Sequence, residues 1–435
     1  MWSLFGSSIR GPLACLFICG LFFSAAQEDP KLRARVVKDL GHGGAENIPK
    51  LEPYLNDSSI DVRIEAVKAL DDIGGPRTLD PLLKALNDAD PEVQIRATDG
   101  LVNFYLPGYL KTGFTASIKR AGNSIKGHFT DTNDQIIDPF VQVRPDVIEA
   151  LGKVARGGSS MDARANAARA LGILRGKAAI PDLIAAIKSN DDEVMYEALI
   201  ALQKIRDPSA GPKVAFLLHD LSPKVQSTAL ETIGLLQDRS TVPQVREALD
   251  RAKDAKVRRS ALTALAMMPD PSTHTLFLTY LRDKDDNMRA AAAEGIARSA
   301  NPQDTATVND LFKDETKTKV KLADAFALVS LGRRENTENS PLYYLISQLG
   351  SRSYRDVAQA YLIELARNPE NRQAIYPYLQ QSGATKDEKI GLARVLATSG
   401  DRDAIPYLET ISHDPDGDVA QEGLRALRTI RARLG

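Results

Sequence analysis

The stretch DVRIEAVKAL, residues 61–70, decides the fold because its apolar residues are spaced for one face of an α-helix. Val62 is followed by Ala66, Ala69 and Leu70, at four, seven and eight residues. Side chains at these spacings lie on the same helix face. The small residues in the middle of that face let a neighbouring helix approach to about 8 Å between axes. The stretch therefore predicts a helix that packs closely against its neighbours.

The same large–small–small–large pattern recurs along the chain. Its first residue returns at intervals of 31 or 32 residues, at Ala163, Val194, Val225, Val257, Met288 and Val320. Each unit also contains a first helix with a proline in its first turn, where proline loses no hydrogen bond; these are Pro49, Pro81, Pro145, Pro181, Pro243 and Pro406. Asp-rich turns, such as residues 87–90 and 283–286, precede the second helices and cap their free N–H groups. The chain is therefore predicted to be all-α, a stack of about eleven helical hairpins.

The residues that open and close the pattern resemble those of a known family. Asp61-Val62-Arg63 and Leu171-Gly172 are similar to HEAT repeats, in the short form of about 31 residues called the phycobilisome-lyase HEAT-like type. The resemblance covers residues 31–435 apart from one insertion. It implies a right-handed α-α superhelix, a HEAT/armadillo-like solenoid whose second helices line the concave side. We expect the arginines that follow the first apolar residue to pair with an aspartate of the turn or of the next repeat; these are Arg63, Arg164, Arg258 and Arg289.

Length and composition agree with a solenoid. The chain has 435 residues, which is long for one compact core, but each repeat of a solenoid buries its apolar face only on its neighbours. The formal net charge is −1 at pH 7, so no overall basic excess is present to attract nucleic acid. We therefore expect no nucleic-acid partner.

The first 26 residues form a separate segment with the features of a secretory signal peptide. An apolar run, residues 12–23, is followed by small residues and a predicted cleavage between Ala26 and Gln27. The alternative is a membrane anchor, but this run is shorter than the about 20 residues that a spanning helix needs. Both cysteines, Cys15 and Cys19, lie in this segment. We expect a cysteine-free mature chain in the periplasm or outside the cell of a bacterium, with no membrane insertion after cleavage.

The repeat pattern is interrupted once, over residues 106–143. This insertion divides the predicted solenoid into residues 27–105 and 144–435. One interpretation of the insertion is a helix, because Phe114 and Ile118 begin a possible helix face. The other is a small three-stranded β-meander, because apolar and polar residues alternate in three short stretches with glycines between them. We favour the β insertion.

The insertion is also the predicted place for specific binding. Insertions in a repeat array often carry function, since loops tolerate variation that the packed repeats do not. The candidate partner-binding residues are aromatic, basic or histidine side chains: Tyr109, Phe114, Lys119, Arg120, Lys126, His128 and Phe129. The alternative is that the insertion only fills a gap in the stack.

No catalytic or metal-binding pattern is found in the sequence. The HEAT-repeat enzyme deoxyhypusine hydroxylase holds two irons with His-Glu pairs, whereas none of the five histidines here is followed by glutamate. The run that begins with Asp414 imitates a calcium loop, but Val419 and Arg425 replace its required glycine and glutamate. We therefore predict no metal, no cofactor and no enzymatic activity.

The leading hypothesis is a non-enzymatic scaffold that holds a protein partner on the concave face, together with the insertion. The first rival is a lyase or chromophore-handling protein, which the resemblance to bilin lyases implies. The predicted export argues against it, because bilin attachment is cytosolic. The second rival is a small-ligand binder with a pocket between the insertion and the concave face. The sequence identifies neither the partner nor the oligomeric state.

Overall fold

The fold consists of paired helices stacked in one array. The computed structural model describes residues 29–109, 135–381 and 383–434. A single helix, α1 (Pro30–Gly41), comes first and packs along α3 (Ile60–Ile73). Eleven helical hairpins follow within the described residues, which confirms the predicted number.

In ten of the eleven hairpins the first helix is shorter than the second. The first helices are short and are mostly extended by a 3-10 turn; they are α2 (Ile48–Leu51), α4 (Leu79–Ala85), α7 (Pro145–Gly157), α9 (Ile180–Ala186), α11 (Gly211–Val214), α13 (Val242–Arg251), α15 (His274–Tyr280), α17 (Thr305–Asp314), α19 (Pro341–Ser347), α21 (Pro369–Ile375) and α23 (Ile405–Ile411). The second helices have 11 to 18 residues. They are α3, α5 (Pro91–Tyr105), α8 (Met161–Ile173), α10 (Asp192–Ile205), α12 (Pro223–Leu236), α14 (Ala255–Met267), α16 (Asp286–Ser299), α18 (Thr318–Ser330), α20 (Arg355–Leu365), α22 (Lys386–Ser399) and α24 (Gly417–Leu434).

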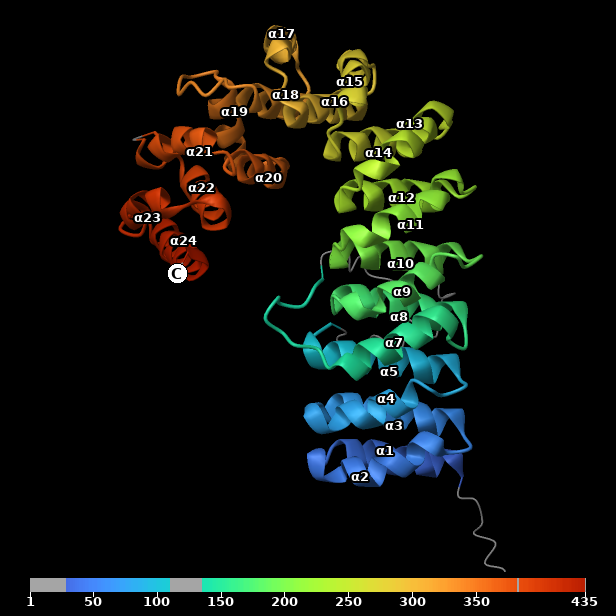
Figure 1. The fold of residues 1–435 in the computed structure, drawn as a ribbon. Coiled ribbons are helices and arrows are strands. Elements are labelled where there is room, and N and C mark those ends of the chain that lie inside the picture. The colour runs from blue at the N-terminus through green and yellow to red at the C-terminus, as the bar shows by residue number, and fades with distance from the viewer. Residues whose placement is uncertain (1–28, 110–134, 382, 435) are drawn as a thin grey trace, which may run out of the picture.

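The stack curves into a hook (Figure 1). The helices from α1 to α14 form a nearly straight column, and the chain then turns over through α16, α18 and α20 and descends to α24 on the other side of the hook. The first helices α13, α15 and α17 lie on the outer side of the bend, and the second helices α14, α16 and α18 lie on the inner side. The protein is thus a right-handed α-α superhelix whose second helices line the concave side, as predicted.

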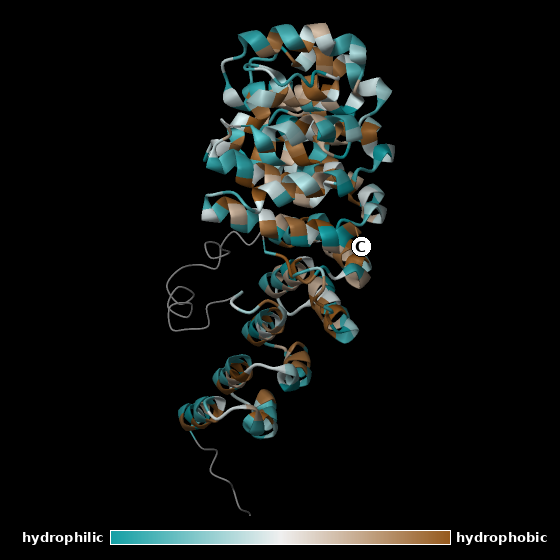
Figure 2. Cartoon of the chain, turned by 90° about the vertical axis from the view of Figure 1, so that its left-hand side faces the viewer, coloured by the Kyte–Doolittle hydropathy of each residue, from teal (hydrophilic) through white to brown (hydrophobic). Residues whose placement is uncertain are grey.

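Neighbouring second helices pack directly on one another because small residues let their backbones meet. A Cβ atom added at Gly172 of α8 would lie 2.7 Å from the Cα atom of Ala201 in α10. At Gly234 of α12 it would lie 2.8 Å from the Cα atom of Ala264 in α14. Figure 2 shows the lower hairpins almost end-on, as two columns of helices joined by short turns. The close packing predicted from the small residues of the repeat is therefore confirmed.

The Asp-rich turns cap the second helices as predicted. Asp90 accepts hydrogen bonds from the backbone N–H groups of the first turn of α5, and Asp191 and Asp254 do the same for α10 and α14. Each carboxylate satisfies N–H groups that have no partner within the helix. The turn residues therefore fix where each second helix begins.

The recurring arginines link one repeat to the next in part. Arg63 pairs with Asp88 of the following turn at 2.7 Å, and Arg289 pairs with Glu315 at 3.0 Å. The prediction is wrong for Arg164, which donates to a backbone oxygen of its own hairpin, and for Arg258, which forms no ion pair with any described residue. An ion pair between this arginine and an acid of the next repeat therefore forms in some repeats and not in others.

The part of the insertion that the structure describes contains no strand. Residues 135–143 are irregular, with a turn in the middle. The buried Ile137 donates its backbone N–H to the end of α8 at 3.0 Å, whereas Phe140 is 91% exposed. The third predicted strand is therefore wrong, because the turn interrupts its alternation and its backbone bonds to a helix end. The other two predicted strands, residues 114–119 and 125–130, lie outside the described residues.

Candidate functional site on the concave face

The middle of the concave face is hollowed across four successive second helices, α12, α14, α16 and α18. The hollow has a volume of about 330 Å³. Small side chains at its centre, Ser260, Ala290 and Ala291, leave this space open. The position of Ser260 holds the larger side chains of Glu65 in α3 and Glu197 in α10. Charged side chains stand around the hollow: Glu231, Lys256, Arg259, Glu294 and Lys319.

The second residue of the helices that line the hollow departs from the rest of the array. It is lysine in α12, α14 and α18 (Lys224, Lys256 and Lys319, called here the lysine row) and Asn287 in α16. An acid at this position is favoured by the partial positive charge of a helix N-terminus, by about 0.3–1 kcal/mol, and a lysine is not. The four helices without the acid are the four that line the hollow. In the other seven second helices the residue is acidic: Asp61, Glu92, Asp162, Glu193, Asp356, Asp387 and Asp418.

The lysine row is only partly neutralised. Lys224 pairs with Glu193 of α10 at 2.7 Å. Lys319 donates to the side-chain oxygen of Asn287 at 2.5 Å. This amide carries no charge. Lys256 is exposed and forms no ion pair with any residue that the structure describes. Two of the three ammonium groups therefore stand at the hollow without a carboxylate partner among the described residues.

The edge opposite the lysine row is acidic. Glu231 of α12 accepts a hydrogen bond from the hydroxyl of Ser260 at 2.9 Å. Glu294 of α16 accepts one from Arg298 at 3.0 Å and one from the hydroxyl of Tyr361 at 2.7 Å. The hollow is therefore polarised, with cations toward the amino ends of the helices and carboxylates toward their carboxyl ends.

The bend beyond the hollow is fixed by a contact between α16 and α20, which are separated by α18. Arg298 donates to both carboxylate oxygens of Glu364, at 2.8 and 3.0 Å. Tyr361 stacks on Phe326 of α18 with ring centroids 4.6 Å apart, and the guanidinium of Arg298 lies 5.5 Å from the same ring. Burial raises the pKa of the Tyr361 phenol well above its usual value, and Glu294 adds to this effect. The phenol therefore stays protonated and holds α20 against α16.

A buried carboxyl interrupts the apolar pattern of α18. Asp324 is 2% exposed, and its Oδ2 atom has no hydrogen-bond partner among the described residues. Burial raises the pKa of this carboxyl to about 7, with Glu315 adding to the shift and Arg289 opposing it. Seven other second helices carry a buried alanine at the same position: Ala66, Ala97, Ala167, Ala198, Ala229, Ala261 and Ala292.

A second polar cluster is buried on the concave side of α5, α8 and α10. Arg169 of α8 donates to both oxygens of Glu197 in α10 at 3.1 and 2.5 Å, and both side chains are almost fully buried. Asn166 donates to Asp99 of α5 at 3.0 Å. Tyr109, near the start of the insertion, is hydrogen-bonded to Arg169, and burial raises the pKa of its phenol. The insertion therefore begins on the concave side of the stack.

The far end of the insertion is attached to the same side. The ammonium group of Lys204, at the end of α10, donates to the backbone oxygen of Gln135 at 3.2 Å. Of the predicted partner-binding residues, Tyr109 alone lies in the described part, and its role toward a partner stays a prediction. Outside it lie Phe114, Lys119, Arg120, Lys126, His128 and Phe129, together with the predicted cleavage residues Ala26 and Gln27.

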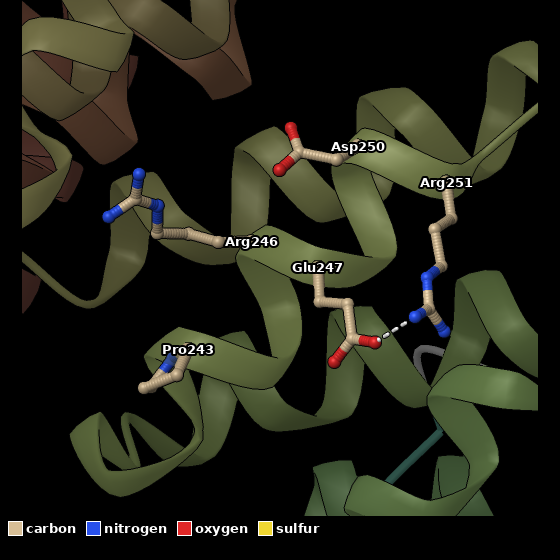
Figure 3. A pocket seen from close by; sticks show the side chains of 5 residues that line it. All are labelled: Pro243, Arg246, Glu247, Asp250 and Arg251. Carbon is tan, nitrogen blue, oxygen red and sulfur yellow. Dashed lines mark ion pairs between the residues drawn. The ribbon is translucent and has the colours of Figure 1, made fainter.

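A hollow on the outer side of the stack offers no comparable arrangement. It has a volume of about 430 Å³ and lies over α13, which supplies all of its lining residues (Figure 3). Glu247 and Arg251 form an ion pair at 2.7 Å, and Arg246 extends away from them. Because one helix supplies every side chain and two acids balance two arginines, this hollow is a solvated helix face.

No group of three or more His, Cys, Asp or Glu side chains in residues 29–109, 135–381 and 383–434 is arranged to hold a metal ion. No helix in the same part of the chain combines the length and the apolar character that crossing a membrane requires.

Comparison with known families places the chain. The family model described as HEAT repeats matches residues 22–102, 148–215, 212–276 and 246–329, which together make up more than half of the sequence. The chain belongs to the HEAT-repeat family. No curated protein matches the sequence closely enough to count as a relative.

Several solved structures are similar to these HEAT repeats. The complex of CpcE and CpcF of phycocyanin lyase from Nostoc sp. PCC7120 shares 16% identity, covering 62% of this chain and 94% of that chain at a TM-score of 0.35. An engineered protein shares 20% identity over 88% of this chain and 98% of its own, at a TM-score of 0.37. Kap121p shares 12% identity over 93% of this chain and 48% of its own, at a TM-score of 0.41. Each is similar to this chain in fold alone.

Proposed function

We propose that this HEAT-repeat protein is a non-enzymatic scaffold that holds a protein partner on its concave face, in the periplasm or outside the cell. The observation that carries the proposal is the polarised hollow across α12, α14, α16 and α18, where lysines replace acids that helix stability favours. Residues that break a local rule of stability are expected at functional sites. The location rests on the apolar segment of residues 12–23 and is proposed with it.

The arrangement of the hollow suits a macromolecular partner better than a small molecule. Its lining residues come from four successive second helices, so an occupant that contacts all of them extends across several repeats. Small-molecule sites are concave and mostly apolar, with few polar groups. Here charged side chains surround the space instead, as is typical of the charged surfaces that orient protein partners.

Site-specific photo-cross-linking tests the proposal. Benzoylphenylalanine is placed either at Thr263, in the hollow, or at Lys313, on the outer helix α17, in the full chain expressed in the cells that make it. We expect the Thr263 variant to give one cross-linked product of reproducible mass, with the same partner identified in each replicate. The Lys313 variant is expected to give none. Equal products at both positions, or no product at Thr263, would contradict the proposal.

A further inference from the structure

The charges of the hollow define what kind of segment fits it. Lys256 and Lys319 stand on one edge without a carboxylate partner among the described residues, while Glu231 and Glu294 on the other edge are already hydrogen-bonded within the protein. The edge that carries Lys256 and Lys319 therefore lacks the negative charge that would balance its lysines, whereas the carboxylates of the opposite edge already have partners.

Lys224 continues the row of lysines into the neighbouring repeat, where it already has a carboxylate partner. Its ammonium group shares Glu193 of α10 and lies 4.0 Å from the ring centroid of Tyr196. An ammonium group over an aromatic face is attracted by the ring. The lysine row thus runs across α12, α14 and α18 in one line, with the amide of Asn287 between its last two members.

The centre of the hollow favours an extended backbone. Ser260, Ala290 and Ala291 have short side chains, so an extended segment approaches the helices there without a clash. The polar groups of that segment meet the Ser260 hydroxyl and the carboxylates of the acidic edge. A helix of the partner, about 10 Å in diameter, is too wide for a hollow of this volume.

The spacing of the helices sets the length of the segment. Packed helices lie about 8–10 Å apart, so α12 and α18 are separated by roughly 30 Å. An extended chain advances about 3.3 Å per residue and crosses this distance in about nine residues. One helix spacing then corresponds to about three residues, so acids opposite Lys224 and Lys256 lie about three residues apart and acids opposite Lys256 and Lys319 about six. The residue midway between the last two lies opposite Asn287. A polyproline-II-like segment, with about three residues per turn, presents such positions on one face.

We infer that the hollow binds an extended acidic segment of the partner protein, with carboxylates about three and then about six residues apart that face Lys224, Lys256 and Lys319. This inference rests on the proposed function and adds the chemistry of the partner to it. A polyphosphate chain fits less well, because Glu231 and Glu294 would repel its continuous negative charge.

Fluorescence anisotropy on the full chain tests the inference. The probe is a labelled peptide of four Glu-Gly-Ser units, compared with a Lys-Gly-Ser peptide and a single-stranded oligodeoxynucleotide. The test variant is K256E/K319E, and the matched control is K213E/K313E, which changes net charge equally on the outer helices α11 and α17. Circular dichroism verifies that both variants keep the helical content of the parent chain.

We expect the acidic peptide to bind the parent chain and the control within about twofold of each other. The test variant should bind at least about tenfold more weakly, because each reversal turns an attraction into a repulsion. Binding should weaken as salt rises from about 50 to 500 mM, since such contacts are screened. Equal weakening in both variants, no binding, or tighter binding of the lysine peptide or the oligonucleotide would overturn the inference.

The outcome also separates this inference from the proposed function. If the peptide fails to bind while the cross-link at Thr263 persists, the partner is held by other chemistry and the acidic segment is wrong. If the cross-link is absent as well, the proposed function fails together with it.

Discussion

Replacing Asp324 with alanine should make the protein more stable, and the gain should depend on pH. This carboxyl is buried in α18 at a position where seven other second helices carry a buried alanine, and its Oδ2 atom has no partner among the described residues. Burial raises its pKa from 3.8 to about 7. Since the folded state disfavours the charged form, ionisation of Asp324 opposes folding.

The magnitude follows from the shift in pKa. One unit corresponds to about 1.4 kcal/mol, so the penalty reaches about 4 kcal/mol once the carboxyl of the folded protein is ionised. The penalty is absent below the unfolded pKa of 3.8, grows as pH rises, and is complete above the folded pKa of about 7. D324A should therefore raise the free energy of unfolding by up to about 4 kcal/mol at pH 8 and by less than about 1 kcal/mol at pH 4.

Hydrogen exchange is the suitable assay, because a solenoid opens locally and its unfolding need not be two-state. Exchange of α17 and α18 peptides, corrected for the intrinsic effect of pH, is compared between D324A and the parent chain at pH 4 to 8. D324N keeps the size of the side chain and removes its charge, so it should reproduce the pH-dependent part of the stability gain of D324A. D310A, at an exposed acid of α17, should change protection by less than about 0.5 kcal/mol. A gain from D324A that is the same at every pH would refute the reasoning.

Four further outcomes are expected. E197Q should lower the hydrogen-exchange protection of α8 and α10 by about 3–5 kcal/mol, because it leaves the buried guanidinium of Arg169 without a charged partner, whereas R169M/E197L should recover most of that loss. Replacing Gly234 with valine should cost α12 and α14 about 1–3 kcal/mol in the same assay, because its side chain meets the backbone of α14; unchanged protection would show that the helices move apart freely. Mass spectrometry of the exported protein should show a chain that begins at Gln27, and a retained first residue would refute cleavage. The absorption spectrum of the purified protein should lack a visible band, since a bound chromophore would favour the rival lyase-type function.

The hairpin stack was predictable because the information lies in short stretches. The spacing of Val62, Ala66 and Leu70 specifies a helix face, and its recurrence specifies stacking. The aspartates of the turns were predictable for the same reason, since a cap acts within one helical turn. Eleven hairpins follow from counting such local signals.

The third predicted strand of the insertion is wrong because a proline interrupts the alternation of apolar and polar residues on which the prediction rested. Pro139 has no N–H group to offer a neighbouring strand and stands in the turn that interrupts the segment. The contact between Arg298 and Glu364 was not predictable at all. This contact joins residues in α16 and α20. It depends on the curvature of the stack, which is the sum of small rotations between successive repeats.

The lysine row was present in the sequence but was missed. No single repeat reveals it, because a lysine near a helix start is unremarkable alone. It emerges when the second residue of every second helix is compared, and when the structure shows that Lys224, Lys256 and Lys319 belong to helices that line one hollow. Such a site is found in the sequence where a residue differs from the type that most repeats carry at the same position.

The yield of the Thr263 cross-link in the two charge-reversal variants tests the central claim most directly. The claim is that the middle of the concave face holds an acidic segment of a protein partner. It predicts that K256E/K319E loses the cross-linked product while K213E/K313E keeps it, with both chains folded and present at equal amounts. A product of equal yield in both variants would contradict the claim.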